Sequence, residues 1–219
     1  MLFSLFERWI KPTASAPAGE PPKGLWAFYW HYLRQAKGPF IALFCAGCTV
    51  AFLDSLMPVF MGRIVTLVTT GAPSTLVADH GPELLRMALV VLLARPLALF
   101  TQNLITNQTI NGNITNLIRW QSHWHVVRQS WTFFQNDFAG RIANRVLQTG
   151  PALRESLVLA FDAAWYIIVY GGSATLLLSS FDWHLALPIM VWFGCYAVML
   201  RYFVPRLRSE EHTSELQSH

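Results

Sequence analysis

The sequence predicts an all-α membrane protein that crosses the bilayer several times, and two observations lead to this fold class. Of the 219 residues, 53% are hydrophobic and only 13% are charged, whereas about 25% of the residues in a soluble domain are charged. The apolar residues also form long runs, with neither the stripes of a soluble helix nor the alternation of a soluble strand. Such runs indicate that hydrocarbon surrounds much of the chain.

Four apolar runs are long enough to cross about 30 Å of hydrocarbon at about 1.5 Å per residue. We predict membrane helices over residues 39–61, 84–106, 157–180 and 183–204. The segment TTGAPSTLVADHGPE between the first two runs is turn-rich and predicts a loop, and SSFDWH between the last two is a shorter one. Each pair of helices should therefore form an antiparallel hairpin. Pro96 is expected to kink the second helix and to loosen its backbone hydrogen bonds.

A polar stretch over residues 107–156 separates the second run from the third. Its first half has aromatic and apolar residues spaced three and four apart, which indicates a helix. These residues are Trp120, Trp124, Val127, Trp131 and Phe134. We therefore expect the second and third helices to extend about 30 Å beyond the membrane.

The positive charges are distributed unevenly between the two sides of this topology. Thirteen of the 16 Lys and Arg residues fall in the N-terminal segment, in residues 107–156, or at and after the end of the fourth run. The positive-inside rule assigns that side to the cytoplasm. The prediction is a bacterial plasma-membrane protein with a cytoplasmic N-terminus and helices 2 and 3 extended into the cytoplasm.

The two ends of the sequence differ from the rest. Residues 1–24 combine a short segment, which could lie as an amphipathic helix on the membrane surface, with a linker rich in Pro, Ala and Gly. The last twelve residues, RSEEHTSELQSH, are polar and aperiodic, and they match the translation of a common sequencing adapter. We expect residues 208–219 to be an assembly artefact and the natural reading frame to continue into more protein.

Three sequence segments, in order and at suitable spacing, resemble the transmembrane domain of type I ABC exporters, a fold found in bacterial fused permease/ATPases. FFQNDFAGRIANRV (133–146) resembles the FFD-x-x-x-x-G-x-I-x-x-R-V pattern of their first intracellular loop. PVFMGRIV (58–65) is similar to the exit of their first helix, and LWAFYWHYLRQAKG (25–38) to the interfacial elbow helix. The resemblance covers residues 25–207 and implies four of the six helices of such a domain.

The resemblance also implies a contact with an ATPase. In exporters the first intracellular loop ends in a transverse coupling helix that docks on the nucleotide-binding domain. The matching residues here are Ser130, Trp131, Thr132, Phe133, Phe134, Gln135 and Asn136, with Gly140 and Arg145 in the adjacent loop motif. An alternative is that these aromatic residues only pack between the extended helices. The family often has Asp four residues after the arginine, where this chain has Thr149, so the salt bridge that Asp would provide is absent.

Polar residues within the predicted spans are candidates for internal contacts, because charge is costly in hydrocarbon. Asp54 and Arg95 have similar predicted depths, and we expect an ion pair, with a substrate contact as the alternative. Gln102, Asn103 and Asn107 could line a water-filled cavity, whereas the polar residues beyond Gln108 are expected to be in water without a function.

The sequence has no Gly-Lys dipeptide and hence no G-x-x-x-x-G-K-[ST] phosphate loop. We expect no catalytic residues, no metal site and no nucleic-acid partner. The expectation is the membrane part of an ATP-driven exporter, inactive alone, with ATP and Mg²⁺ bound by a fused or separate nucleotide-binding domain and with a second transmembrane subunit. A secondary transporter, or a membrane anchor such as a sensor input domain or a haem subunit, remains as the alternative.

Overall fold

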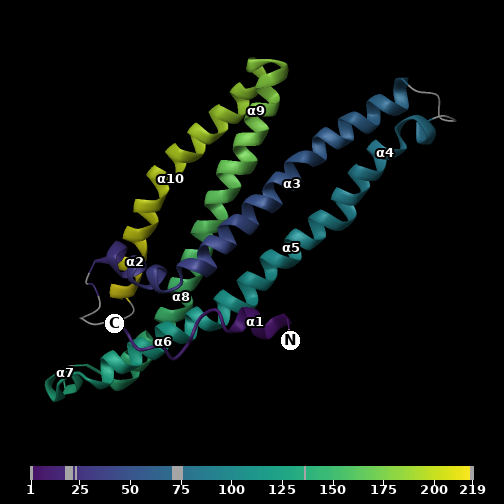
Figure 1. Cartoon of the computed structure of the whole chain (residues 1–219). Coiled ribbons are helices and arrows are strands. Elements are labelled where there is room, and N and C mark those ends of the chain that lie inside the picture. The colour runs from purple at the N-terminus through teal and green to yellow at the C-terminus, as the bar shows by residue number, and fades with distance from the viewer. Residues whose placement is uncertain (1, 18–21, 23, 71–75, 136, 218–219) are drawn as a thin grey trace. The chain divides into compact units, whose positions relative to one another are not determined.

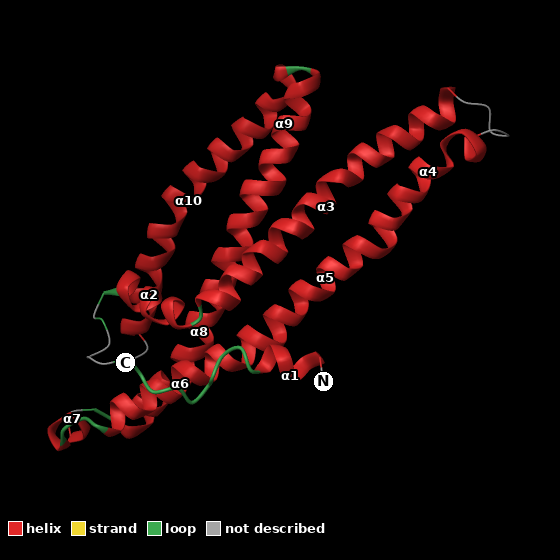
Figure 2. Cartoon of the chain, viewed as in Figure 1, coloured by secondary structure: helices red, strands yellow, loops and turns green. Residues whose placement is uncertain are grey.

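A computed structural model describes residues 2–17, 22, 24–70, 76–135 and 137–217, and the regular elements in these residues are helices (Figure 2). Four helices of this described part are long and apolar enough to cross a membrane. The predicted all-α, multi-pass fold is therefore confirmed. The chain folds as two compact units, Met1–Tyr170 and Gly171–His219.

The first two membrane helices lie side by side in the unit Met1–Tyr170 (Figure 1). The first is longer than predicted, because it continues as helix past the end of its apolar run, and the second extends beyond its run into the polar stretch, as expected. The first is α3 (Lys37–Thr70), and the second is an unbroken run of α4 (Leu76–Leu89), η1 (Val90–Ala94), α5 (Arg95–Leu104), η2 (Ile105–Asn111) and α6 (Gly112–Val127).

The long turn-rich loop predicted between these two helices is wrong for most of its length. α3 continues to Thr70 and α4 starts at Leu76, while residues 71–75 lie outside the described residues. Pro82 lies inside α4 and lacks the N–H that would bond to the Ala78 carbonyl, yet the helix continues through it. Glu83 beside it bonds to Arg63 of α3, so a tertiary contact stabilises helix where local turn propensity favoured a loop.

Two stretches of the second helix have π geometry, with hydrogen bonds five residues apart. In η1 the Arg95 N–H donates to the Val90 carbonyl. Pro96 follows directly and lacks the N–H that would bond to the Leu92 carbonyl, so the wider turn fits the loosening expected at this proline. In η2 the buried side chains are Ile105, Thr109 and Ile110, and Ile105 and Ile110 are one π turn apart.

The third membrane helix is a continuous run of α8 (Ala139–Trp165), η3 (Tyr166–Gly171) and α9 (Gly172–Phe181). Its first part, α8, returns along α6. α8 approaches α6 very closely at Gly150, where an added Cβ would lie 2.8 Å from the Thr115 carbonyl oxygen. A second close approach joins α8 to α3, because a Cβ on Gly47 would overlap the Trp165 ring.

Pro151 lies inside α8 without breaking it. A proline at this position cannot donate to the Leu147 carbonyl one turn earlier. The Arg119 side chain of α6 supplies the missing donor, since its Nε lies 3.2 Å from the Leu147 oxygen. The carbonyl group freed by the proline thus becomes a contact between the two helices.

A buried apolar core forms where α2 (Leu25–Gln35), α3, η2, α6 and α8 meet. It is centred on side chains with almost no exposed surface, and the rings of Phe40 and Phe161 stack with centroids 5.1 Å apart. The core residues are Ile10, Tyr32, Ala36, Phe40, Leu43, Ile105, Ile110, Ile114, Leu117, Ile118, Leu153 and Leu157. Burial of this apolar surface holds the elements together wherever water surrounds them.

The N-terminal segment packs on the second helix. After α1 (Leu2–Glu7), residues 8–17, which we call the strap, follow the second helix with Ile10 buried in the core. Asn113 Nδ2 donates to the Glu7 carbonyl at 2.9 Å, and Thr109 Oγ1 donates to the Phe6 carbonyl at 3.0 Å. These side chains satisfy carbonyl groups that the end of a helix leaves free.

The unit Gly171–His219 is a helical hairpin of α9 and α10 (Trp183–Gln217), joined at Asp182. The Asp182 carboxylate accepts the His184 N–H at 3.0 Å and so caps the start of α10. α10 continues past the predicted end of the fourth span at 204, and the polar tail is helical to Gln217. Its Arg, Glu, Leu and Gln residues have good helix propensity.

Candidate functional site

The predicted coupling element is a short helix at the end of an arm. α6 ends at Val127, α7 (Trp131–Gln135) follows after three residues, and α8 returns from Ala139 (Figure 1). α6, α7 and the part of α8 that packs on α6 are called the arm below. Of the predicted set, Ser130 precedes α7, residues 131–135 form it, and Asn136 lies outside the described residues.

The aromatic residues of α7 are exposed. Trp131 exposes 76% of its surface and Phe138, just after α7, exposes 78%. Phe133 and Phe134 contact each other edge to face with centroids 5.4 Å apart, and both keep more than a third of their surface exposed. Trp131 is too exposed to fit the alternative, in which these rings pack between α6 and α8. An exposed aromatic cluster of this kind is typical of a protein-binding surface.

Asp137 fixes the junction between α7 and α8, and our sequence reasoning missed it. Its Oδ1 accepts the Phe138 N–H at 2.8 Å and a hydrogen bond from Arg141 Nε. Its Oδ2 lies 3.4 Å from Arg145 Nη1. An acidic residue before a helix with arginines four and eight positions later is a pattern that the sequence contains, and it could have been recognised.

The Asp137 carboxylate is stabilised in its charged form. Partial desolvation alone would raise its pKa, but the hydrogen bonds from Arg141 and the Phe138 N–H, with the charges of Arg141 and Arg145, hold the pKa of Asp137 below its usual value. The carboxylate therefore stays ionised at any physiological pH. It holds both arginines at the first turns of α8.

The two residues of the loop motif have different environments. Arg145 pairs with Asp137, so this upstream carboxylate provides the local salt bridge that was expected to be absent. Thr149 instead donates from Oγ1 to the Arg145 carbonyl at 2.6 Å. Gly140 lies in the first turn of α8, and a Cβ added there would meet nothing within 4 Å.

Asp54 and Arg95 form an ion pair between α3 and the second helix. Arg95 Nε lies 2.6 Å from Asp54 Oδ1, so the structure brings together the two charges expected to pair. Arg95 is the first residue after η1, and the π turn sets the direction in which its side chain leaves the helix. In hydrocarbon a pair of this kind avoids the cost of two isolated charges.

The predicted cavity residues lie on an open face of the second helix. Asn103 and Asn107 are exposed and Gln102 is half-buried. Asn103 Nδ2 donates to the Leu99 carbonyl at 3.0 Å, and Asn111 Nδ2 donates to Asn107 Oδ1 at 2.9 Å. Among the residues beyond Gln108, Asn113 is not simply in water, because it bonds to the end of α1.

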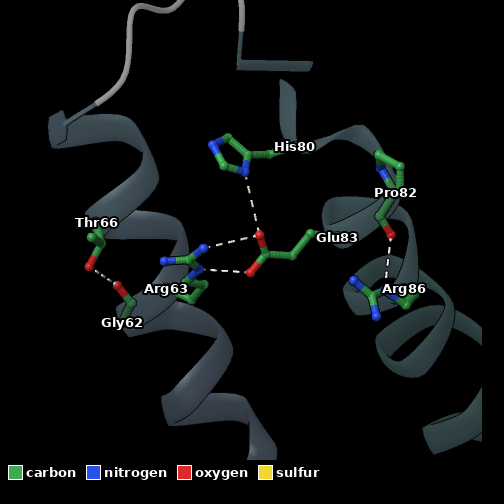
Figure 3. Close-up of polar contacts among 7 residues, drawn as sticks. All are labelled: Gly62, Arg63, Thr66, His80, Pro82, Glu83 and Arg86. Atoms are coloured by element: carbon green, nitrogen blue, oxygen red, sulfur yellow. Dashed lines mark hydrogen bonds and ion pairs between the residues drawn. The ribbon is translucent and has the colours of Figure 1, made fainter. Parts of the chain in front are cut away.

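A second ion pair joins the far ends of the same two helices (Figure 3). Arg63 donates from Nε to Glu83 Oε1 at 2.7 Å and from Nη2 to Oε2 at 3.2 Å, a two-pronged contact. His80 Nδ1 lies 3.5 Å from the same carboxylate. Together with Asp54 and Arg95, this contact fixes the antiparallel register of α3 and the second helix.

Taken together, these features define a class of protein. The chain is a multi-pass helical membrane protein in which the second and third membrane helices continue as a packed arm with exposed aromatic residues at its tip.

A family model of the ABC transporter transmembrane region matches residues 40–215, so the chain belongs to this family. The chain is also 28% identical over 206 residues to an uncharacterized ABC transporter ATP-binding protein of Haemophilus influenzae. That match covers 94% of this chain and 33% of the relative, so the chain spans about a third of the relative's length. No solved structure matches the chain.

Proposed function

We propose that the chain is part of the membrane domain of an ATP-driven exporter, and that α7 is the element that contacts the nucleotide-binding domain. The observation that carries the proposal is the exposed aromatic cluster of Trp131, Phe133, Phe134 and Phe138 at the tip of the arm. Large aromatic side chains surrounded by polar groups provide most of the binding energy in many protein interfaces.

The arm has the stiffness that such a lever needs. α6 and α8 are in backbone contact at Gly150, Arg119 bonds across to the Leu147 carbonyl, and Asp137 clamps the junction at the tip. A displacement of α7 would therefore move both membrane helices that continue from the arm. The movement of the ATPase domains as they close would then be transmitted through the second helix to Asp54 and Arg95.

Further parts of the proposal rest on charge and on the family. The distribution of Lys and Arg supports a bacterial plasma membrane with the N-terminus and the arm in the cytoplasm. A second transmembrane subunit would complete the substrate pathway, with Gln102, Asn103 and Asn107 on the face toward the cavity. ATP and Mg²⁺ would bind to the nucleotide-binding domain, because this chain has no phosphate loop. The 219 residues alone should therefore neither hydrolyse ATP nor transport.

The test is alanine substitution at the tip in the full-length transporter. Trp131→Ala should lower substrate-stimulated ATPase activity about tenfold, since interface aromatic residues of this kind are often hot spots, and Phe134→Ala should lower it less. Nucleotide binding should not change, because the lost contact lies between domains. Phe181→Ala, which removes an equally exposed ring from α9, is the matched control. Equal losses in Trp131→Ala and Phe181→Ala would contradict the coupling role.

A further inference from the structure

Asp162 is an acidic residue of α8 that lies within the third membrane span. It follows the start of the predicted span at residue 157 by five positions, which corresponds to a depth of about 8 Å. Contacts with α3 give a similar depth independently, because Phe161 contacts Phe44 edge to face and Trp165 covers Gly47. Both partners lie inside the first span, which begins at residue 39. The Asp162 carboxylate is therefore surrounded by hydrocarbon on its cytoplasmic side.

The Asp162 carboxylate has a neutral partner. Its Oδ1 accepts a hydrogen bond from Trp165 Nε1 at 3.0 Å, and none of the ion pairs in the described part of the chain includes it. By contrast, Asp54 of α3 is balanced by Arg95. A half-buried carboxylate without a positive partner is costly in hydrocarbon. A bound cation would remove this cost.

Two tyrosine rings lie on the same face of the helix as Asp162. Tyr166 and Tyr170 follow it at intervals of four residues, and residues four apart share a face of a helix. An α-helix would drift by about 80° over this distance, and the wider turn of η3 reduces the drift. The two rings stack with centroids 5.1 Å apart and expose 54% and 37% of their surface. The helix thus presents a carboxylate and two exposed rings in one row.

Trp165 fixes the position of this row. Its indole ring lies against the backbone of α3, where a Cβ on Gly47 would be 2.4 Å from the ring. The same indole donates to Asp162 and contacts Tyr166 edge to face, with centroids 5.9 Å apart. The carboxylate and the first tyrosine are therefore oriented before a ligand arrives, which lowers the entropy cost of binding.

We propose that Asp162, Tyr166 and Tyr170 form a binding site for a lipophilic organic cation. The carboxylate attracts the positive charge, while the rings contact apolar substituents and add cation–π attraction. An anion would be repelled by the carboxylate, and a small hydrated cation would gain little from the rings. That this cation is the transported substrate rests on the proposed function, whereas the binding site itself does not.

The test uses the 219-residue chain in dodecyl maltoside, with tritiated tetraphenylphosphonium as the probe and equilibrium dialysis against protein-free micelles as the readout. We expect saturable binding, stronger than that of tetraphenylborate, an anion of the same shape that is measured separately. Asp162→Asn keeps an acceptor for Trp165 and should weaken tetraphenylphosphonium binding about tenfold, because one charge contact is lost. Glu155→Gln is the matched control. It removes an exposed carboxylate two turns earlier on α8, outside the predicted span, and should leave binding unchanged.

A second variant tests the rings without a change of charge. Tyr166→Leu keeps an apolar side chain but removes the cation–π attraction, and it should weaken tetraphenylphosphonium binding about threefold. It serves if Asp162→Asn fails to fold, as judged by circular dichroism and gel filtration. Equal binding of the two ions, or equal losses in Asp162→Asn and Glu155→Gln, would overturn the proposal and show that the carboxylate is neutralised within the protein.

The full-length transporter separates this site from the proposed function. Tetraphenylphosphonium should stimulate its ATPase activity, and Asp162→Asn should abolish this stimulation. Trp131→Ala should still bind the cation while losing the stimulation, because α7 is remote from the site. Binding without stimulation in the unmodified transporter would uphold the site and contradict the role of the cation as substrate. Absence of binding would overturn the site and leave the contact between α7 and the ATPase unaffected.

Discussion

The two ends of the α3–second helix pair are held together by different forces. At the arm end, apolar side chains such as Phe40, Leu43 and Ile114 are almost completely buried between four elements. Toward α4, side chains such as Leu85 and Leu92 are mostly exposed, and two ion pairs join the helices, Asp54 with Arg95 and Arg63 with Glu83.

The difference follows from the solvent at each end. Burial of apolar surface stabilises a contact only if the alternative is water. Within a bilayer, lipid tails surround a leucine as favourably as another helix does, so polar contacts and close approach of small residues provide the specificity. Along this one pair of helices, the contacts thus change from apolar burial at the arm end to ion pairs toward α4. The following variants test this contrast.

The largest loss is expected from breaking the ion pair at membrane depth. Arg95→Ala leaves the Asp54 carboxylate without its partner and should lower the free energy of unfolding by about 3 kcal/mol. The double variant Asp54→Asn, Arg95→Ala should cost less than the sum of the single variants. Unfolding by sodium dodecyl sulfate in mixed micelles would give all four values. Additive losses would mean that the pair contributes no coupling.

A smaller loss is expected in the arm, where backbones touch. Gly150→Ala places a Cβ 2.8 Å from the Thr115 carbonyl oxygen, and the shift this forces should cost about 2 kcal/mol. Gly112→Ala is the matched control, because a Cβ there meets nothing within 4 Å. That change should stabilise the helix by about 0.5–1 kcal/mol. The same sign for both variants in thermal unfolding would refute the close approach of α6 and α8.

At the arm tip, Asp137→Asn should loosen the start of α8 without unfolding the chain. Because the folded pKa of Asp137 is lowered, its stabilising effect is present above the unfolded value of about 3.9 and is lost as the pH falls through the folded value. Hydrogen exchange at the Arg141 and Ile142 amides should be faster in the variant at pH 7. Near pH 3 the two proteins should become similar. A constant difference at all pH values would exclude the carboxylate charge as the cause.

The smallest effect is expected at the exposed pair near the start of α4. Arg63→Gln and Glu83→Gln should each reduce stability slightly, with a coupling that fades in 1 M NaCl because salt screens exposed charges. The Asp54–Arg95 coupling should persist in the same salt. If both couplings faded equally, the two pairs would have the same environment and the contrast between depths would be lost.

Long apolar runs were sufficient to predict the four membrane helices, because their hydropathy is a property of the sequence alone. The pairing of Asp54 with Arg95 was also predictable, since two charges at similar depth have few other partners in hydrocarbon. The ends of the helices could not be predicted in this way. Thr70 and Pro82 lie in helices because of contacts between α3 and α4, and no local sequence pattern indicates those contacts.

The core near η2 was predictable from helical spacing only in part. Ile110, Ile114, Leu117 and Ile118 are buried at the three-and-four spacing of an α-helix. The step from Ile105 to Ile110 is five residues, which is one π turn, and the spacing of an α-helix does not predict where such a turn lies. The contact of Asn113 was not predicted either. Its partner is the main-chain carbonyl group of Glu7, and a sequence pattern does not show where such carbonyl groups lie.

The π segment η2 also sets the phase of everything that follows it. An α-helix turns by about 100° per residue, and a π turn takes five residues where an α turn takes about four. The segment Ile105–Asn111 therefore contains about one residue more than an α-helix would need to bring Ile114 and Ile118 to the core. Deletion of one residue within it, with a return to α geometry, would leave α6 nearly in phase. Deletion of Asn116 in α6 would instead rotate the residues after it by about 100° and would take Ile118 out of the core. Single-residue deletions should therefore be better tolerated in η2 than in α6, and in an alignment of relatives we expect gaps to fall in η2.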